Sequence, residues 1–445
     1  MTKKKVLLLT DFSLVKTGFA RSAKALLSYL YKTDKYELVH LCVGMNEDSP
    51  ELKKTPWKSI GTLPSSPSKI AEINRDPKLK TTAHYGSFIL DEVIEQEKPD
   101  IFIGAQDIWG LDFAVSKHWF EKINSAVWTT LDSLPLLPTA VELAPEIKNF
   151  WMWSSFATKE MHRLGHKHVR TVHGIIDTHN FKRLLDEERK TLRQKNNIPE
   201  DCYVIGFVFR NQLRKSAPNL IEAFKIFRKN NPQIKNSKLL LHTSFAEGWD
   251  LKALADEYKV NWNDILTTVV CGKCGKYEVK TFTKPNDKCR FCLTPNSVNT
   301  TGVGQGVSEL ELNEVYNLMD VYCHPFTSGG QEIPIQEAKL TELITLVTDY
   351  SCGEEMCDPA ANSLSLNWSE YREFGTQFIK ATTDPKHIAK RLEEVYKLSD
   401  HKKDKMGKAA RAWALQNFSV ESVGKKIENF LDSCKAIDKD NYPKT

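Results

Sequence analysis

Short, nearly continuous apolar runs recur along this chain and alternate with segments of helical periodicity. Lys4–Leu9, Asp100–Gly104 and Tyr203–Phe209 are such runs, as expected of strands that are buried on both faces of a parallel sheet. Ala20–Tyr31 and Asn219–Lys229 instead repeat apolar residues with the spacing of an amphipathic helix. This alternation predicts an α/β protein with parallel sheets and right-handed crossovers.

The same rhythm suggests how the chain is divided. At 445 residues it is too long for one core of ordinary size. The pattern breaks at GIIDTHNF, residues 174–181, and then restarts. We therefore predict two Rossmann-like, doubly wound domains at 1–178 and 179–415, and a C-terminal helix within 416–445 that crosses back to the first domain. Parallel sheets bind ligands at the carboxyl ends of their strands, so two such domains facing across a cleft would share one binding gap.

The most informative turn is HPFTSGGQEIPIQEA, residues 324–338, which follows an apolar run and opens a helix. We expect Gly329 and Gly330 to adopt positive φ and to bring the backbone close to a ligand. Pro334 suits the first turn of the helix, whose unpaired N–H groups form a phosphate site. Glu337, one turn further on, is placed to accept hydrogen bonds from sugar hydroxyls. An ordinary strand-to-helix connection would give the same local pattern.

Four of the ten cysteines form two close pairs. Cys271 and Cys274 make one C-x2-C pair, and Cys289 and Cys292 make another after fourteen intervening residues. Each pair offers two thiolates from one tight turn, so the four predict a structural Zn²⁺ in an inserted ribbon at 271–300. Four free thiols or a redox pair are the alternatives.

Basic and aromatic residues alternate within this ribbon. They are Lys273, Lys276, Tyr277, Lys280, Phe282, Lys284, Lys288, Arg290 and Phe291. Such a pattern can follow a phosphate backbone and stack bases, so nucleic-acid contact is one interpretation. The simpler one is a small core of aromatics with a soluble lysine surface. The net charge of +5 is mild and decides neither.

Composition places the chain among soluble globular proteins, with 41% hydrophobic and 27% charged residues. It contains no apolar run of about 18 residues, so we expect no membrane insertion. The N-terminal segment MTKKKVLLLTDF has only a brief apolar run and no small-residue cleavage site. We interpret it as a first strand and expect a cytoplasmic location.

Four short blocks, taken in order, resemble the family-four retaining glycosyltransferases of the GT-B fold. They are the Thr17-Gly18 turn, GIIDTHNF, GFVFRNQLRK and the turn at 324–338. The resemblance implies that Thr17 and Gly18 lie under the transferred sugar and the donor phosphate. It further implies that Arg210 and Lys215 grip the donor diphosphate.

Within the last block, the resemblance implies that Glu337 binds the donor ribose. The family has a second glutamate eight positions earlier, but Gly329 stands there in this chain. Gln331 and Glu332 are nearby candidates for its contacts. A histidine that follows a first-domain strand in the family is matched here by Asp132, which either orients a substrate or caps the next segment. These departures indicate an unusual donor or acceptor.

The implied reaction needs cations but no catalytic metal. Glycosyl transfer leaves negative charge on the diphosphate, which Arg210, Lys215 and the N–H groups after Gly330 would stabilise. The resemblance implies retention, with Asp132, Arg210 and Lys215 as catalytic candidates and a nucleotide sugar, UDP-linked, as co-substrate. The acceptor hydroxyl would belong to a glycan or to a hydroxylated nucleobase in DNA. The rival interpretation, suggested by the missing carboxylate at Gly329, is a non-catalytic GT-B-like protein that binds nucleotides or nucleic acid. A separate alternative is that Arg210 and Lys215 form only a solvated strand end.

Overall fold

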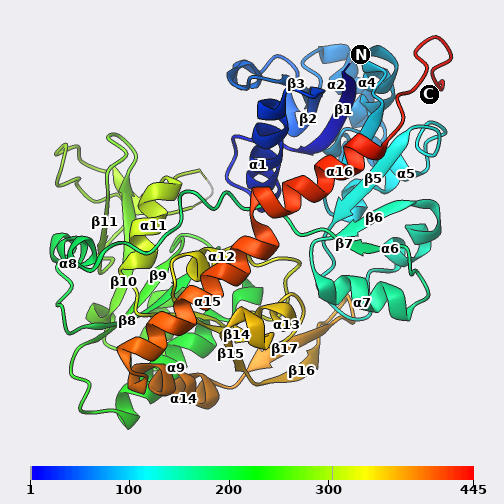
Figure 1. Ribbon diagram of the computed structural model, residues 1–445. Coiled ribbons are helices and arrows are strands. Elements are labelled where there is room, and N and C mark those ends of the chain that lie inside the picture. Colours follow the sequence, from blue (N-terminus) through cyan, green and yellow to red (C-terminus); the bar gives the residue numbers. More distant parts are fainter. Residues whose placement is uncertain (1–2, 303) are drawn as a thin grey trace. The chain divides into compact units, whose positions relative to one another are not determined.

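The computed structural model describes residues 3–302 and 304–445, which form two compact units. Unit 1 comprises Met1–Asp177 and Asn417–Thr445, and unit 2 comprises Thr178–Gln416. Each unit is built on a largely parallel sheet that is covered by helices (Figure 1). The predicted α/β class with two Rossmann-like sheets is therefore confirmed.

Unit 1 contains a seven-stranded sheet in the order β3-β2-β1-β4-β5-β6-β7, with all neighbours parallel. The strands are β1 (Lys4–Asp11), β2 (Tyr36–Asn46), β3 (Lys58–Leu63), β4 (Ile101–Gly104), β5 (Asn124–Thr129), β6 (Asn149–Met152) and β7 (Arg170–Thr171). Because β1 lies between β2 and β4, the direction in which strands are added reverses there. This reversal is the position at which doubly wound sheets bind ligands.

The helices of unit 1 cover both faces of this sheet. They are α1 (Gly18–Thr33), α2 (Pro67–Arg75), α3 (Pro77–Thr82), α4 (Leu90–Glu97), α5 (Asp112–Val115), α6 (Pro138–Leu143), α7 (Ser155–Arg163) and α16 (Lys425–Ser433). Leu7 and Leu9 of β1 join one hydrophobic core, whereas Val6 and Leu8 join a second core on the opposite face. Alternate side chains of a strand point to opposite faces, so both cores follow from the continuous apolar run.

Unit 2 contains an eight-stranded sheet in the order β11-β10-β9-β8-β13-β14-β15, in which β12 also pairs with β10. The strands are β8 (Tyr203–Val208), β9 (Ser237–His242), β10 (Ile265–Cys271), β11 (Tyr277–Lys280), β12 (Val298–Thr300), β13 (Val321–His324), β14 (Ile344–Thr348) and β15 (Ser363–Leu366). β11 and β12 run antiparallel to β10, whereas the other pairs are parallel. The order reverses at β8, between β9 and β13.

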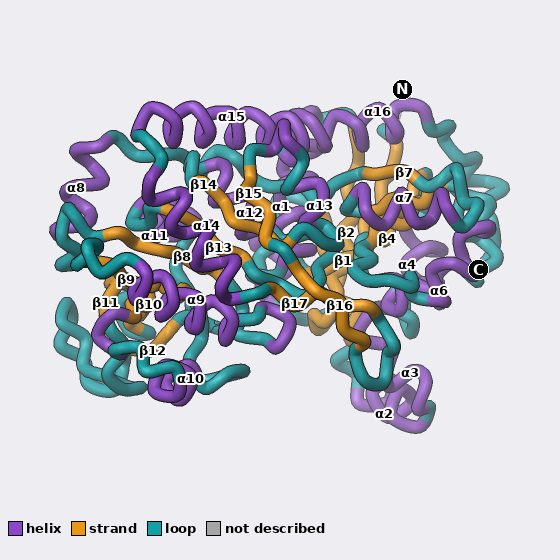
Figure 2. Tube along the Cα trace, turned by 90° about the horizontal axis from the view of Figure 1, so that it is seen from below, coloured by secondary structure: helices purple, strands orange, loops and turns teal. Residues whose placement is uncertain are grey.

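Helices surround the second sheet as well. They are α8 (Asp186–Lys195), α9 (Ala217–Asn230), α10 (Leu251–Glu257), α11 (Glu309–Asn317), α12 (Ile333–Leu340), α13 (Gly353–Met356), α14 (Pro385–Lys397) and α15 (Asp400–Phe418). Figure 2 shows α15 and α10 on opposite sides of the strands of unit 2. A separate antiparallel hairpin, β16 (Trp368–Arg372) and β17 (Ile379–Thr383), follows β15. Among the described residues, no helix combines the length and the apolar character needed to cross a bilayer.

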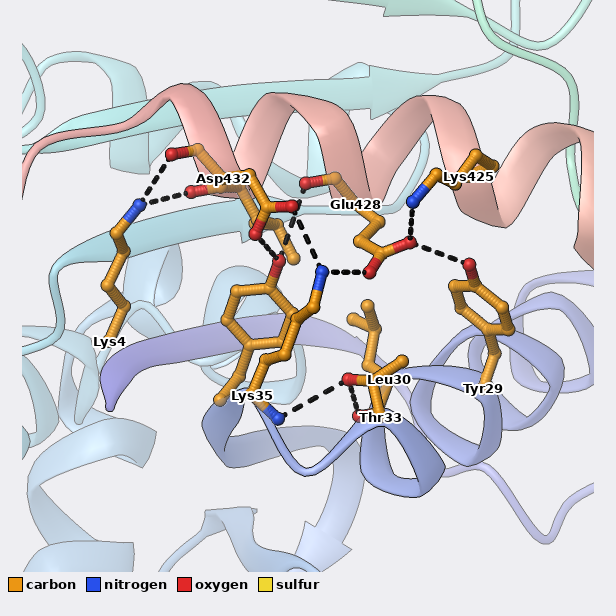
Figure 3. Close-up of polar contacts among 10 residues, drawn as sticks. Lys4, Tyr29, Leu30, Thr33, Lys35, Lys425, Glu428 and Asp432 are labelled. Carbon is orange, nitrogen blue, oxygen red and sulfur yellow. Dashed lines mark hydrogen bonds and ion pairs between the residues drawn. The ribbon is translucent and has the colours of Figure 1, made fainter. Parts of the chain in front are cut away.

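Helix α16 is fixed to α1 of unit 1 by a buried carboxylate (Figure 3). Glu428 accepts hydrogen bonds from Lys35 Nζ at 2.6 Å, Lys425 Nζ at 2.7 Å and Tyr29 OH at 2.7 Å. These hydrogen bonds, that of Lys35 foremost, lower the pKa of Glu428 to about 2, although burial acts in the opposite direction. Folding therefore favours the ionised form of Glu428.

We predict that this site makes stability depend on pH in the acid range. A carboxyl group whose pKa falls on folding stabilises the protein above its unfolded pKa, and the effect disappears as pH falls from about 4.5 to about 2. Glu428→Gln should lower the free energy of unfolding at pH 7 by about 2 kcal/mol, because hydrogen bonds to a charged group are lost. Urea unfolding at pH 7 and at acid pH should show a smaller pH effect in Glu428→Gln than in the unmodified chain. The exposed Glu72→Gln is the matched control, and equal pH effects in all three proteins would contradict the prediction.

Candidate active site

Two loops meet at the carboxyl edge of the sheet in unit 2, where the strand order reverses. The loop after β8 carries Arg210, Arg214 and Lys215, and the loop after β13 is the turn at 324–338. The two loops are hydrogen-bonded directly, since the Thr327 N–H donates to the carbonyl of Arg214 at 2.8 Å. The structure thus brings the predicted cations and the predicted turn to one edge.

A buried carboxylate joins these loops. Glu332 accepts from Arg214 Nη1 at 2.5 Å, from Lys215 Nζ in a short ion pair, and from His324 Nε2 at 3.0 Å. Burial alone would raise the pKa of Glu332, but the charges of Lys215 and Arg214 hold it well below its usual range. Glu332 is therefore ionised even though the residue is only 3% exposed.

The partners of Glu332 respond to the same environment. Burial lowers the pKa of Lys215 to about 8, while the charge of Glu332 acts to raise it. Burial likewise lowers the pKa of His324 to about 4, so its imidazole is neutral at pH 7. A carboxylate can only accept, so His324 carries its proton on Nε2, and its Nδ1 faces the Tyr322 hydroxyl at 2.8 Å.

Gly329 needs to be glycine for a different reason from the expected one. Its φ lies outside the left-handed region, and its N–H donates to Ser351 Oγ at 3.2 Å, so the expectation of positive φ at this residue was wrong. A Cβ at position 329 would lie 2.3 Å from Glu332 Oε1. The carboxylate of Glu332 thus occupies the space in which a side chain at position 329 would begin.

The remaining donor-site candidates of unit 2 differ in their access to solvent. The side chain of Arg210 is 55% exposed and, among the residues that the structure describes, forms an ion pair with Glu247 at 3.5 Å. Glu337 is buried on α12, with Pro334 in the first turn as expected, and it accepts from Tyr316 OH at 2.8 Å. Gln331 Nε2 donates to Gln336 at 3.0 Å, and Gly330 lies beside Gln331 in the same loop.

Sequence reasoning missed three charged or polar groups at this edge. Arg214 and His324 are bound to Glu332, and Lys380 Nζ donates to Ser328 Oγ at 2.8 Å within the turn. Arg214 and His324 were detectable, because each lies at or just after a strand end in a parallel sheet. Lys380 was not, because it belongs to the β16–β17 hairpin, for which no strand was predicted.

Unit 1 has its own polar cluster where its strand order reverses. Asp11, the last residue of β1, accepts short hydrogen bonds from Thr17 Oγ1 and Gln106 Nε2. Thr17 is also the N-cap of α1, whose first residue is Gly18, and it accepts from Ala20 N at 3.2 Å. Asp11 and Gln106 were not identified from the sequence, although Asp11 ends β1 and Gln106 follows β4, beside the reversal.

Asp132 lies beyond β5, at the same edge of the unit 1 sheet. Its Oδ1 accepts from Ser133 Oγ at 2.9 Å. The next helix, α6, has Leu137 as its N-cap, so Asp132 does not cap it. The structure places Asp132 on the strand edge where ligands bind in this class of sheet.

The four cysteines of the ribbon converge. Their sulfur atoms lie within 4.8 Å of one another, with Cys271–Cys292 at 3.7 Å and Cys274–Cys289 at 3.8 Å. Thiolates around tetrahedral zinc, with Zn–S near 2.3 Å, are separated by about 3.8 Å. Hydrogen bonding with Ser297 lowers the pKa of Cys271, and hydrogen bonding with Thr294 lowers that of Cys292, whereas the pKa of Cys274 is raised by burial and by its neighbouring thiols. The donor set and the spacing fit zinc, and four protein ligands leave no open position for water.

The ribbon uses most of its aromatics internally. Tyr277 donates a short hydrogen bond to Glu314 of α11, and Phe282 packs against a small core around Val269. Phe291 is 38% exposed, with Lys276 Nζ at 5.3 Å and Arg290 Cζ at 4.8 Å from its ring centre. The core interpretation therefore accounts for two of the three aromatics.

Comparisons with known proteins identify the fold. No protein-family model matches the sequence, and a comparison with curated proteins finds no match. A glycosyltransferase from Rickettsia africae superposes with a TM-score of 0.66 at 14% identity, over 98% of this chain and 99% of that one. HepE from Anabaena, solved with UDP and glucose, gives 0.66 at 14% identity over 97% and 100%. Sucrose-phosphate synthase from Thermosynechococcus elongatus gives 0.68 at 12% over 97% and 98%. The chain therefore has the GT-B glycosyltransferase fold, with a four-cysteine cluster in its second unit.

We predict that the purified protein contains about one zinc ion per chain, because four thiolates complete a tetrahedral site. Cys274→Ser or Cys292→Ser should remove most of this zinc, as measured by inductively coupled plasma mass spectrometry. Cys357→Ser, which lies outside the cluster, should retain it. Equal zinc contents in all variants, or none in the unmodified chain, would refute the assignment.

Gly329→Ala should destabilise unit 2. The new Cβ would displace the Glu332 carboxylate and leave Lys215 buried without its counter-charge. We expect the free energy of unfolding in urea to fall by about 3 kcal/mol, as when a buried ion pair is broken. Gly302→Ala is the control, because the nearest atom to its Cβ is 3.9 Å away. A Gly329→Ala protein as stable as this control would show that Glu332 moves freely.

Proposed function

We propose that this protein is a retaining glycosyltransferase that moves a sugar from a UDP-linked donor to an acceptor hydroxyl. The observation that carries the proposal is the ionised Glu332 cluster beside the exposed Arg210, at the strand reversal of a GT-B fold. Structures of HepE with UDP-glucose, and with UDP and glucose, have the same fold and support the choice of donor.

We propose that the Arg210 guanidinium binds the donor diphosphate. This guanidinium is half exposed, and its ion pair with Glu247 is long, at 3.5 Å, so a phosphate can replace that partner at little cost. A planar guanidinium binds phosphate oxygens bidentately, which lysine cannot do. Lys215 is 4% exposed and pairs with Glu332, so it would contribute positive charge from beneath the loop.

Glu332 is the proposed replacement for the carboxylate that the family resemblance places at position 329. Its Oε1 already lies in the side-chain space of Gly329, and it is ionised, so it can accept hydrogen bonds from the donor sugar. Gly330 and Gln331, in the same turn, would also contact the donor sugar and its phosphate. Glu337, held by Tyr316, is proposed to accept from the donor ribose.

The proposed reaction breaks the bond between the anomeric carbon and the diphosphate oxygen and forms a bond to the acceptor oxygen. The acceptor proton passes to the departing phosphate, so charge and atoms balance. Arg210 and Lys215 would stabilise the negative charge that develops on the leaving group. Thr17 and Gly18 would contact donor sugar and phosphate, and Asp132 would orient the acceptor or the sugar. This chemistry needs no catalytic metal, and the zinc would be structural.

We propose that the domain at 179–415 binds the nucleotide sugar and that the domain at 1–178 binds the acceptor. The helix in 416–445 is proposed to belong to the first domain. The acceptor is proposed to be a glycan or a hydroxylated base in DNA. Nucleic-acid contact through the ribbon would depend on Phe291 with Lys276 and Arg290, the cations that flank its exposed ring. A cytoplasmic location stays a prediction.

Calorimetric titration with UDP tests the donor site. Arg210→Ala should weaken UDP binding by about 2 kcal/mol, roughly thirtyfold, because charge-assisted hydrogen bonds to the diphosphate are lost. Arg75→Ala, on an exposed helix of unit 1, should bind like the unmodified chain. Failure of every nucleoside diphosphate to bind, or normal binding by Arg210→Ala, would overturn the assignment.

Donor turnover separates the enzyme from the rival, non-catalytic nucleotide- or nucleic-acid-binding protein. An enzyme should release sugar slowly from UDP-glucose without acceptor, and nuclear magnetic resonance should detect the α-anomer first, because retention preserves the donor configuration. Glu332→Gln should reduce this release about a hundredfold or more if Glu332 supports the charged transition state. Tight UDP binding without any release of sugar would favour the binding protein.

A further inference from the structure

One pocket in unit 2 is lined by none of the residues proposed for the transfer. It has a volume of about 640 Å³, within the range of small-molecule sites. Its walls are the loop 245–250 with the first turn of α10, the turn at 262–263, and the segment 281–285 that follows β11. None of Arg210, Arg214, Lys215 and Glu332 lines it.

Four half-buried aromatic side chains line this aromatic pocket, which we define by Phe245, Trp249, Trp262 and Phe282. The ring of Phe245 lies 5.8 Å from that of Trp262 and 5.1 Å from that of Phe282. These tilted and edge-on rings form part of the pocket wall, and Lys252 Nζ lies over the Trp262 ring, 5.6 Å from its centre. Such a set of rings provides a stacking surface for a ligand that has its own flat apolar face.

The stacking surface is fixed before any ligand arrives. Trp262 Nε1 donates to the carbonyl of Phe282 at 2.7 Å, which ties the two walls together. The backbone of Trp249 is held by the buried Asn211, whose Oδ1 accepts from Trp249 N at 3.1 Å and whose Nδ2 donates to Trp249 O at 2.9 Å. A preformed site loses little conformational entropy on binding.

The charges on the wall do not suit a polyanion. The lining carries Lys252 and Lys284 against Glu247 and Asp250, so its formal charge is two minus two, or zero, and Glu247 also faces Arg210 at 3.5 Å. Lys252 is already engaged by Asp256, at 2.5 and 2.6 Å. A nucleic-acid strand would need uncompensated cations along its phosphates.

The polar rim suits an uncharged ligand that is rich in hydroxyl groups. Asn263, Thr281 and Thr283 line the pocket together with the carboxylate of Asp250. The Asn263 amide and the two threonine hydroxyls can donate and accept hydrogen bonds, as sugar hydroxyls do, and the Asp250 carboxylate can accept them. A pyranose ring also has a C–H face with partial positive charge, which is attracted to the negative face of an aromatic ring.

We propose that the aromatic pocket is a secondary carbohydrate-binding site that holds a neutral sugar unit of a glycan. It lacks the phosphate-binding cations of the donor edge, so its ligand is not the reacting nucleotide sugar. The proposal does not depend on the transfer reaction, because none of the residues proposed for that reaction lines the pocket.

Saturation-transfer-difference resonance on the full-length chain, with maltotriose, cellotriose and xylotriose as probes, tests this proposal. At least one of the three should bind, and excess UDP should not displace it. Trp262→Ala should weaken the affinity by about tenfold or more through loss of stacking, whereas Trp262→Phe should retain most of it. Trp109→Ala, a half-exposed tryptophan of unit 1, is the matched control and should change nothing.

The exposed polar variant Asn263→Ala/Thr283→Ala provides an independent test that does not touch the aromatic core. It should also weaken sugar binding, with an unchanged melting temperature. No binding of any probe, or normal binding by both the Trp262→Ala and the double variant, would overturn the proposal. Binding of single-stranded oligothymidylate that is lost in these variants, without sugar binding, would instead assign the pocket to nucleic acid and refute it.

Discussion

The polar edge of unit 2 depends on one buried carboxylate. An ionised Glu332 with so little exposure is tolerable only because Lys215, Arg214 and His324 surround it. Those partners come from the ends of β8 and β13, so the ion cluster also fixes the two loops that flank the strand reversal. It further explains Gly329, because a side chain there would take the place of the carboxylate.

The zinc ribbon is connected to the same edge through one helix. β10 pairs with β9 at its start and with β11 and β12 further along, so the strand of the parallel sheet continues into the ribbon. Tyr277 of the ribbon binds Glu314 on α11, and Tyr316 of α11 binds Glu337. The four-cysteine ribbon at one end of the strand is therefore connected to a helix that positions a proposed donor contact.

The two proposed binding sites of unit 2 differ in charge and in the kind of side chain that lines them. The edge at β8 and β13 concentrates charge, with one exposed guanidinium above a buried ion cluster. The aromatic pocket has balanced charge and rigid rings. An anion is expected at the first and a neutral, hydroxyl-rich ring at the second, so the two are chemically complementary rather than redundant.

The sequence by itself determined the fold class and the four-cysteine cluster. Apolar runs that alternate with helical segments specify parallel sheets, and the C-x2-C spacing specifies four convergent sulfurs, because both signals are local. The resemblance to family-four glycosyltransferases also singled out Arg210, Lys215 and Glu337, whose roles stay predictions. The strands β3, β15, β16 and β17 were missed, because short, partly polar strands are selected by their neighbours and not by their own pattern.

Only the tertiary structure decided which side chains meet. Glu332 lies over a hundred residues from Lys215 in the chain, and their pairing requires β13 to lie beside β8. The same holds for the aromatic pocket, whose rings come from three separate segments. A side chain's pKa, its access to solvent and its partners are properties of packed neighbours, and no local pattern of residues encodes them.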